Sequence, residues 1–325
     1  MTEPPSPDGP PLARSGVDRA ALRRTDAQWL AAAWRRARVL IVDPAGRVLC
    51  SAAPSLVFVD PTDPRCEGVP EAERLFLGVD PDGTPYFAVV GELPEGAGAR
   101  PVTIRAVGAV LSDRDAGLFL TAVALANWHA AHRYAPSTGE PTTVSDGGWL
   151  RIDGAGTQLF PRTDPAVIVL VHDAVAGDGG RCLLGHNAAW PVGKDGRRFF
   201  STLAGFVEPG ESAEAAVVRE VHEEVGVTVT GLRYQGSQAW PFPGSLMLGF
   251  TGQADPAQPL RLDPTEIADA RWFTRTEIAS LLSAQPDAWN DPREAPVSGS
   301  GVALPGAASI AQYLIRTWLA GLRLD

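Results

Sequence analysis

The chain has 325 residues, of which 45% are hydrophobic, and it carries a formal net charge of -10. This length suggests two domains with sizeable cores. An acidic protein does not attract phosphate polymers through its bulk charge, so one that handles phosphates needs a local basic patch or a bound metal ion. The three cysteines, Cys50, Cys66 and Cys182, form no CxxC pair and are expected to be free thiols in the reducing cytoplasm.

The first part of the chain predicts an α+β domain. Residues 1–17 are polar and rich in proline, which predicts a disordered tail without the apolar core of a signal peptide. Apolar residues at helical spacing predict a helix from about residue 18 to residue 36. We expect residues 18–133 to continue as two strand–turn–strand units, an apolar strand and a helix, at 37–49, 75–90, 102–111 and 115–134.

The second part of the chain predicts a sheet with flanking helices. Residues 134–160 are rich in Gly, Ser, Thr and Pro and are interpreted as a linker or minidomain. From residue 161 to the end, apolar runs predict buried strands, followed by helices near the C-terminus. We expect strands at 166–172, 181–187, within 229–252 and at 266–273, and helices at 212–225, 274–282 and 308–322. No apolar run approaches the length of a membrane span, so no membrane partner is expected.

The segment Gly205–Val227 concentrates charged residues at fixed spacing, in the pattern G-x5-E-x7-R-E-V-x-E-E-x-G-V. Glu220, Glu223 and Glu224 lie at i, i+3 and i+4, which places three carboxylates on one side of a helix. Their mutual repulsion has to be offset, and a hard divalent cation with oxygen ligands would do so. Arg219 can pair with a carboxylate and hold the group in position.

The residues around these carboxylates fit a loop–helix–loop. Ser212 is a candidate N-cap, and Gly210 and Gly226 stand where the chain must turn on entering and leaving the helix. An isolated acidic triplet would be a solvated helix face, but the many fixed positions favour a site. The predicted apolar face consists of Ala215, Ala216, Val218, Val221 and Val225.

This segment resembles the Nudix box, with no departure from its pattern. The resemblance to the Nudix superfamily implies an α/β/α sandwich that carries the box as a loop–helix–loop. It further implies Mg²⁺ or Mn²⁺ bound by the box glutamates, and hydrolysis of a nucleoside diphosphate linked to a further group.

A second motif, SQAWPFPGSLM at 237–247, resembles the signature of the NADH pyrophosphatase family, with Ala239 in place of a proline. Taken alone, Trp240 and Phe242 between prolines would suit either a rigid ledge for stacking a base or a buried aromatic turn. The resemblance favours the ledge. It also extends to residues 160–171 and 115–132, so it covers most of the chain from about residue 18.

The resemblance implies a role for each matching residue. The metal ligands would be Glu220, Glu224 and Glu266 with the backbone carbonyl of Ala204, and Glu223 would join them or act as the general base beside Arg219. Without the resemblance, Glu266 would be an ordinary loop carboxylate and Phe160 a core aromatic. The residues expected to contact substrate are Phe160, Ser237, Gln238, Ala239, Trp240, Pro241, Phe242, Pro243, Gly244 and Ala311.

The sequence departs from the family at the zinc ribbon that usually joins the two domains. Ala135, Thr138, Ile152 and Ala155 occupy the positions of its four cysteine ligands, so we predict no zinc. The ribbon is expected to persist without metal, held by packing, and to lose the contribution of zinc to folding.

The predicted reaction is hydrolysis of the pyrophosphate of NAD(H) to nicotinamide mononucleotide and AMP, with NAD-cap removal from RNA as a family-level extension. Two alternatives stay open: hydrolysis of ADP-ribose or a dinucleoside polyphosphate, and a nucleotide-binding regulator without catalysis. The resemblance also implies a homodimer.

Overall fold

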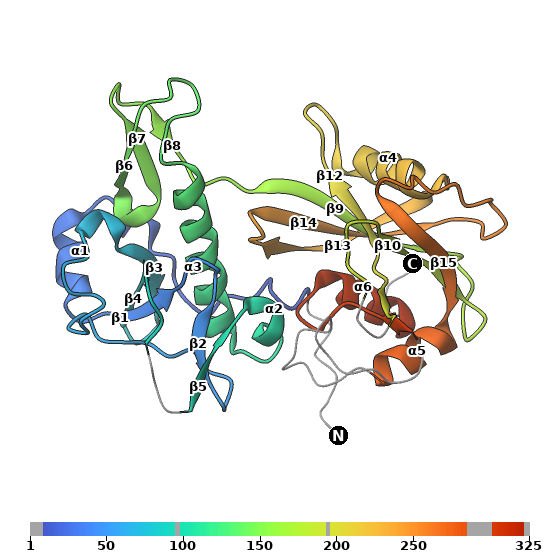
Figure 1. Ribbon diagram of the computed structural model, residues 1–325, viewed down its shortest axis with the longest axis horizontal. Helices are drawn as coiled ribbons and strands as arrows, with labels where there is room; N and C mark the ends of the chain where they lie inside the picture. The colour runs from blue at the N-terminus through green and yellow to red at the C-terminus, as the bar shows by residue number, and fades with distance from the viewer. Residues whose placement is uncertain (1–8, 95–97, 193–195, 285–300, 322–325) are drawn as a thin grey trace. The chain divides into compact units, whose positions relative to one another are not determined.

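The computed structural model describes residues 9–94, 98–192, 196–284 and 301–321. The chain divides into two compact units (Figure 1). Unit 1 comprises Met1–Ala13, Asp164–Ala239 and Leu246–Asp325, and unit 2 comprises Arg14–Thr163 and Trp240–Ser245. Residues 134–160 therefore belong to the same unit as the N-terminal part of the chain.

Unit 1 is built on a six-stranded sheet in which β13, β14, β9, β10 and β15 are neighbours in that order and β12 also pairs with β9. The strands of this sheet are β9 (Asp164–His172), β10 (Arg181–Asn187), β12 (Leu203–Phe206), β13 (Thr230–Trp240), β14 (Ser245–Gln253) and β15 (Ile267–Thr274). Its helices are α4 (Ala213–Val225), α5 (Arg275–Ser283) and α6 (Ile310–Leu319). A short parallel pair, β11 (Arg198–Phe199) and β16 (Val302–Ala303), completes the unit.

Alternating residues of β9 form the two cores of unit 1. Val167, Val169 and Val171 pack with the apolar residues of α4. Ile168 and Leu170 pack instead with residues of α5 and α6. Successive side chains of a strand point to opposite faces of the sheet, so a continuous apolar run indicates a strand that is covered on both sides. The α/β/α sandwich is therefore confirmed.

Unit 2 has a small mixed sheet, in which β4 (Pro85–Val90) pairs in parallel with β1 (Arg38–Val42) and antiparallel with β3 (Leu75–Val79). Helix α1 (Ala27–Trp34) packs on this sheet through Ala33 and Trp34, and the long helix α3 (Asp113–Ala131) contacts the same three strands. The remaining elements are β2 (Val48–Ser51), β5 (Ala99–Val102), α2 (Ile104–Val107), β6 (Thr142–Ser145), β7 (Leu150–Asp153), β8 (Gln158–Leu159) and short 3-10 turns at Ala21–Arg23, Glu71–Glu73 and Asp146–Gly148.

Three expectations for the N-terminal part differ from the structure. The helix expected over 18–36 begins only at Ala27, because Ala20 adopts a left-handed conformation (φ 42°) and the side chain of Asp26 caps the helix by accepting from the Trp29 N–H. The expected strand 102–111 contains α2, since Ile104 and Val107 are both buried three residues apart, as one helical turn allows. Segment 37–49 is not a hairpin: β1 pairs with β4, and β2 pairs with β5.

The N-terminal tail also differs from the expectation of disorder through residue 17. Residues 1–8 lie outside the described residues, but Leu12 is only 2% exposed. Its N–H donates to Oε1 of Gln238 at 3.4 Å, within unit 1. Along the described parts of the chain, no helix combines the length and apolar character needed to cross a membrane.

Candidate active site

The carboxylates of the Nudix-like segment lie on α4, between two turns that the sequence specifies. The side chain of Ser212 accepts a hydrogen bond from the Ala215 N–H at the start of the helix. Gly226 ends it in a left-handed conformation (φ 72°) that favours glycine. One detail of the predicted apolar face is wrong, because Val217 is buried with Ala216, Val221 and Val225, whereas Ala215 and Val218 are exposed.

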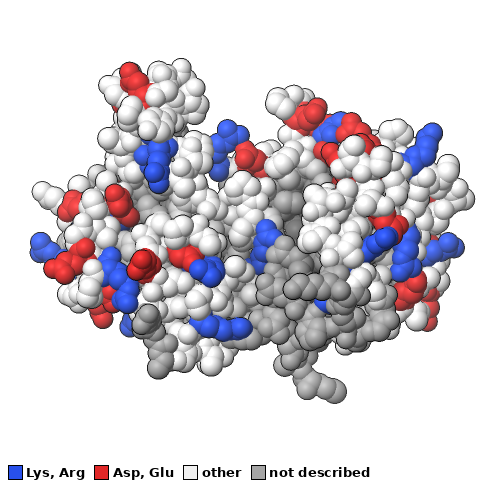
Figure 2. Space-filling view, in the orientation of Figure 1, with Lys and Arg blue, Asp and Glu red and all other residues white. Residues whose placement is uncertain are grey.

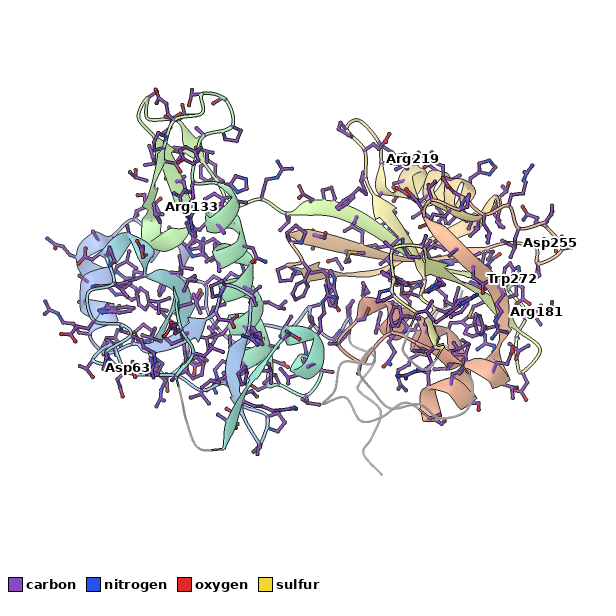
Figure 3. All side chains as sticks on the ribbon, viewed as in Figure 1. Asp63, Arg133, Arg181, Arg219, Asp255 and Trp272 are labelled. Atoms are coloured by element: carbon purple, nitrogen blue, oxygen red, sulfur yellow. The ribbon has the colours of Figure 1, made fainter. Side chains whose placement is uncertain are left out.

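Arg219, labelled on α4 in Figure 3, connects the loop before the helix to the helix itself. Nε and Nη2 donate to the two carboxylate oxygens of Glu211, both at 2.9 Å, and Nη2 also donates to the backbone carbonyl of Phe206. Nη1 donates to Glu220 Oε1 and Glu223 Oε2, each at 2.9 Å. The planar guanidinium therefore holds three carboxylates at once, as its fork of donors permits.

Gly205 is required by close packing against the site. A Cβ atom at this position would lie 1.9 Å from Cδ of Glu220. Gly205 lies on β12, which pairs antiparallel with β9 so that Gly205 is opposite Val167. The glycine thus leaves the space into which the Glu220 carboxylate projects, which explains in physical terms the first position of the motif.

Two of the three glutamates are buried, and their burial changes their proton affinity. Glu220 is 9% and Glu224 4% exposed. The pKa of Glu224 is raised to about 8, mainly by burial and also by the charges of Glu220 and Glu266. A backbone hydrogen bond from Ala204 acts in the opposite direction and lowers this pKa. Burial also raises the pKa of Glu220, partly offset by its bonds with Arg219.

Glu266 reaches this group from a different part of the chain. It lies in the loop before β15, which is tied to the end of α4 because the Asp263 N–H donates to the Glu224 carbonyl and the Arg261 N–H donates to the Val225 carbonyl. The side chain of Glu266 is exposed. The charge of Glu266 contributes to the raised pKa of both Glu220 and Glu224, so its carboxylate lies within electrostatic range of theirs.

These residues fit a divalent cation, although they do not form a complete cage. In the described ranges, no group of three or more His, Cys, Asp or Glu side chains is arranged to hold a metal ion. However, Oε2 of Glu224 is buried without a hydrogen-bond partner, and an ion would satisfy it. This orphaned oxygen fits Mg²⁺, which is commonly bound through one or two carboxylates and substrate phosphates.

Glu223 differs from its two neighbours on α4. Its side chain is exposed, and the interaction that the structure gives it is the bond from Arg219 Nη1. It can therefore reach water while Arg219 fixes its orientation. Access to water and a fixed orientation are the features that make Glu223 a candidate acceptor for the proton of a water molecule.

The predicted substrate motif begins in unit 1 with a residue that has a structural role. Gln238 is only 1% exposed. Its Oε1 accepts from the Leu12 N–H, and its Nε2 donates to the Ala308 carbonyl at 3.1 Å. Both polar ends of Gln238 are thus occupied by backbone groups, so the structure does not support a direct side-chain contact with substrate. Ser237 and Ala239 beside it are half-buried.

The remaining motif residues, Trp240–Ser245, belong to unit 2. The rings of Trp240 and Phe242 meet edge to face, with centroids 5.3 Å apart. Both rings are half-buried, Pro241 is buried and Pro243 is exposed, while Gly244 is half-buried. The peptide bond between Phe242 and Pro243 is cis.

The last two predicted substrate contacts have opposite environments. Phe160 in unit 2 is 65% exposed, so its ring is available for stacking. Ala311 in unit 1 is buried in the core that α5 and α6 form with the sheet. Its side chain therefore packs against protein, which differs from the expected contact with substrate.

The ribbon-like segment of unit 2 forms an antiparallel sheet of β6, β7 and β8. One turn, at two of the positions where the family has its zinc-binding cysteines, is closed by backbone hydrogen bonds. The Ala135 N–H donates to the Glu140 carbonyl, and the Gly139 N–H donates to the Ala135 carbonyl. In the other turn, Asp153 Oδ1 accepts from the Ala155 and Thr157 N–H groups. Hydrogen bonds thus close both turns, and the second turn, with the side chain of Asp153 as acceptor, is of the Asx type.

Two residues of unit 2 that contact the substrate motif were not predicted from the sequence. Asn127 on α3 donates to the carbonyls of Pro241 and Pro243, and Arg105 on α2 lies over the rings of Trp240 and Phe242. The available signal was a polar Asn127 within the largely apolar segment of α3.

Comparison with known proteins assigns both parts of the chain. A family model for the NUDIX domain matches residues 162–294, and a model described as the NADH pyrophosphatase-like rudimentary NUDIX domain matches residues 28–128. The NAD-capped RNA hydrolase NudC of Mycobacterium tuberculosis (strain ATCC 25618 / H37Rv) is 41% identical over 318 residues, which cover 96% of this chain and 95% of that protein.

Two further proteins show more partial similarity. The NAD-capped RNA hydrolase NUDT12 of Homo sapiens is 34% identical over 218 residues, which cover 64% of this chain and 43% of that protein. A solved NUDIX hydrolase from Nitrosomonas europaea is 24% identical and covers 50% of this chain and 92% of that chain, with a TM-score of 0.33. From the two family models and the match to the mycobacterial hydrolase along nearly its whole length, this chain belongs to the Nudix hydrolase family, in the branch with an N-terminal NADH pyrophosphatase-like domain.

Proposed function

We propose that this Nudix hydrolase cleaves the pyrophosphate bond of NAD(H), giving nicotinamide mononucleotide, or its reduced form from NADH, and AMP. The observation that carries the proposal is the group of carboxylates on α4, fixed by Arg219 and extended by Glu266. The similarity to NAD-capped RNA hydrolases along the chain supports NAD as the reacting group.

The reaction adds one water molecule to the substrate. The water oxygen forms a bond to one phosphorus while the bond from that phosphorus to the bridging oxygen breaks, and Glu223 accepts the proton of the water. Mg²⁺ or Mn²⁺ held by Glu220, Glu224, Glu266 and the Ala204 carbonyl would neutralise phosphate charge and lower the pKa of a bound water. Arg219 keeps Glu223 oriented, since Nη1 bonds to it at 2.9 Å.

The same chemistry applies to a NAD cap at the 5′ end of an RNA. On the face shown in Figure 2, acidic and basic residues are interspersed over the described residues, and no extended basic track is visible there. This pattern and the net charge of -10 support recognition of the cap rather than of a long stretch of RNA. Hydrolysis of capped RNA should therefore depend only modestly on salt, because few phosphate contacts release few counterions.

Product analysis by chromatography tests this function. Purified protein is incubated with Mg²⁺ or Mn²⁺ and, separately, with NADH, NAD⁺, ADP-ribose, diadenosine polyphosphates and a NAD-capped RNA. We expect metal-dependent formation of AMP and nicotinamide mononucleotide, fastest from NADH. Faster cleavage of another compound would show that NAD(H) is not the preferred substrate, while pyrophosphate hydrolysis would stand as the reaction. The absence of turnover by folded protein would favour a nucleotide-binding regulator.

The homodimer and the cytoplasmic location implied by the sequence remain predictions. Sedimentation of the purified protein measures the first. Cys50, Cys66 and Cys182 are buried and free, and burial raises the pKa of each thiol, which agrees with the expectation of unpaired cysteines.

A further inference from the structure

The loop between β13 and β14 has few means of fixing its own conformation. Its sequence is Pro241-Phe242-Pro243-Gly244, and a proline has no N–H to donate. Within the loop, the Phe242 N–H donates to the Trp240 carbonyl at 2.7 Å. Pro241 is buried, so its carbonyl group needs a donor from elsewhere, since backbone acceptors away from water are nearly always paired.

Asn127 supplies that donor. Its Nδ2 lies 2.8 Å from the Pro241 carbonyl oxygen and 3.3 Å from that of Pro243. Asn127 lies on the 19-residue helix α3, where its neighbour Trp128 is buried. One amide group on a rigid helix thus bonds to both ends of the Pro-Phe-Pro sequence.

Arg105 fixes the aromatic side chains of the same loop. Its guanidinium carbon lies 4.2 Å from the ring centroid of Phe242 and 5.0 Å from that of Trp240, both within the range of a cation–π interaction. Arg105 is held in turn by its flanking residues on α2, because Ile104 and Val107 are both buried. One guanidinium thus packs against both rings of the loop.

We infer that Arg105 and Asn127 are positioning residues that order the Trp240–Ser245 loop and thereby determine the affinity for the dinucleotide. This inference rests on the proposed function and on the contact between this loop and the substrate that the sequence predicts. Neither residue takes part in the chemistry. Residues of α2 and α3 then contribute to substrate recognition by fixing a loop of their own unit.

The test combines hydrogen exchange with steady-state kinetics. Asn127→Asp keeps the shape of the side chain but removes the donor and places a carboxylate against two carbonyl oxygens. We expect faster hydrogen exchange in peptides that cover 240–247, and a KM for NADH raised by about fivefold to tenfold, the loss of roughly one hydrogen bond. The kcat should stay within about twofold of the wild-type value, because the substitution weakens substrate binding and leaves the groups that carry out the reaction in place.

Substitutions at Arg105 provide a graded version of the same test. Arg105→Lys keeps a cation near the rings, so it should raise the KM by less than Arg105→Gln does. Arg36→Ala is the matched control, because this exposed arginine of unit 2 donates to the carbonyl of Gly83 and should leave both measurements unchanged.

The outcomes separate this inference from the proposed function. If the wild type hydrolyses neither NADH nor NAD⁺, the proposed function fails, and the KM is measured with the dinucleotide that it does cleave. If exchange at 240–247 stays at the wild-type rate in folded Asn127→Asp and Arg105→Gln, the positioning role is refuted. Faster exchange with an unchanged KM would refute the link between loop order and affinity.

Discussion

The two regions matched by Nudix family models differ in what the polar side chains of their principal helices contact. On α4 of unit 1, Glu220 and Glu224 are buried among other carboxylates, and Arg219 donates to Glu220. On α3 of unit 2, Asn127 and His129 bond to backbone carbonyls of neighbouring loops. The polar groups of Asn127 and His129 thus bond to backbone, whereas those of Glu220 and Glu224 form part of a group of carboxylates.

This difference has an energetic consequence. Buried like charges raise the free energy of the folded state, and Oε2 of Glu224 has no hydrogen-bond partner. In unit 2, the polar groups of Asn127 and His129 have partners and should contribute to stability. Substitutions in unit 1 are therefore expected to change activity more than stability, and substitutions in unit 2 the reverse, apart from the loop contacts of Arg105 and Asn127.

The largest effect is expected for Glu220→Gln. The glutamine keeps an oxygen that can accept from Arg219 but removes the negative charge. Metal-dependent hydrolysis should therefore fall by about 10³-fold, as it does when an enzyme loses a group that stabilises charge in the transition state. The thermal midpoint should stay the same or rise, because a buried charge is removed. Glu214→Gln, an exposed change in the first turn of the same helix, is the control and should alter neither. Retention of wild-type turnover would show that the site lies elsewhere.

Glu223→Gln tests the division of roles within α4. If Glu223 accepts the proton of water, turnover should fall by about 10²-fold while nucleotide binding changes little. Calorimetric titration with a non-hydrolysable NAD analogue measures binding, and the chromatographic assay measures turnover. Equal losses in both would mean that Glu223 holds the substrate or its metal ion and does not act as the base.

Arg219→Lys is expected to be an exception in unit 1, because it should change both activity and stability. A lysine cannot reproduce the paired bonds to Glu211 and the bonds to Glu220 and Glu223. We expect turnover to fall by about tenfold to a hundredfold and stability by about 1–3 kcal/mol in urea unfolding. Arg198→Lys, which affects one exposed ion pair with Asp269, should change neither, and a similar result for both variants would contradict the role of Arg219.

Much of this site could be predicted from the sequence because its determinants are local. The i, i+4 spacing places Glu220 and Glu224 on one side of α4, and the continuous apolar run of β9 predicts a strand covered on both faces. The same local rules misplaced Val218, since a shift of one position on a helix moves a side chain by about 100°.

The contacts that the sequence did not reveal join residues far apart in the chain. Asn127 meets Pro241 across 114 positions, and Gln238 meets Leu12 across 226. Periodicity predicts the face on which a side chain lies, but it does not predict which distant backbone group that face meets. The same limit explains why β1 was expected to pair with β2, its neighbour in sequence, whereas it pairs with β4.

The smallest predicted effect concerns His129 and the pH dependence of unit 2. Nη1 of Arg151 can only donate, so Nδ1 of His129 must accept it at 2.9 Å, and Nε2–H donates to the Gly148 carbonyl. Protonation of Nδ1 would place two donors against each other. Burial is the main cause that lowers the pKa of His129 to about 4, and the positive charges of Arg151 and His132 add to it.

The sign of the effect follows from proton linkage. An unfolded chain binds a proton at this histidine below about pH 6.5, whereas the folded chain does so only near pH 4, so stability is lost as the pH falls between these values. At pH 5.5 the loss should be about 1 kcal/mol. Hydrogen exchange of α3 and β7 peptides at pH 7.5 and 5.5, corrected for intrinsic rates, measures it. The glutamine of His129→Gln does not titrate, so protection from exchange in this variant should change less with pH. If the variant responds to pH as the wild type does, His129 is not the group whose protonation lowers stability.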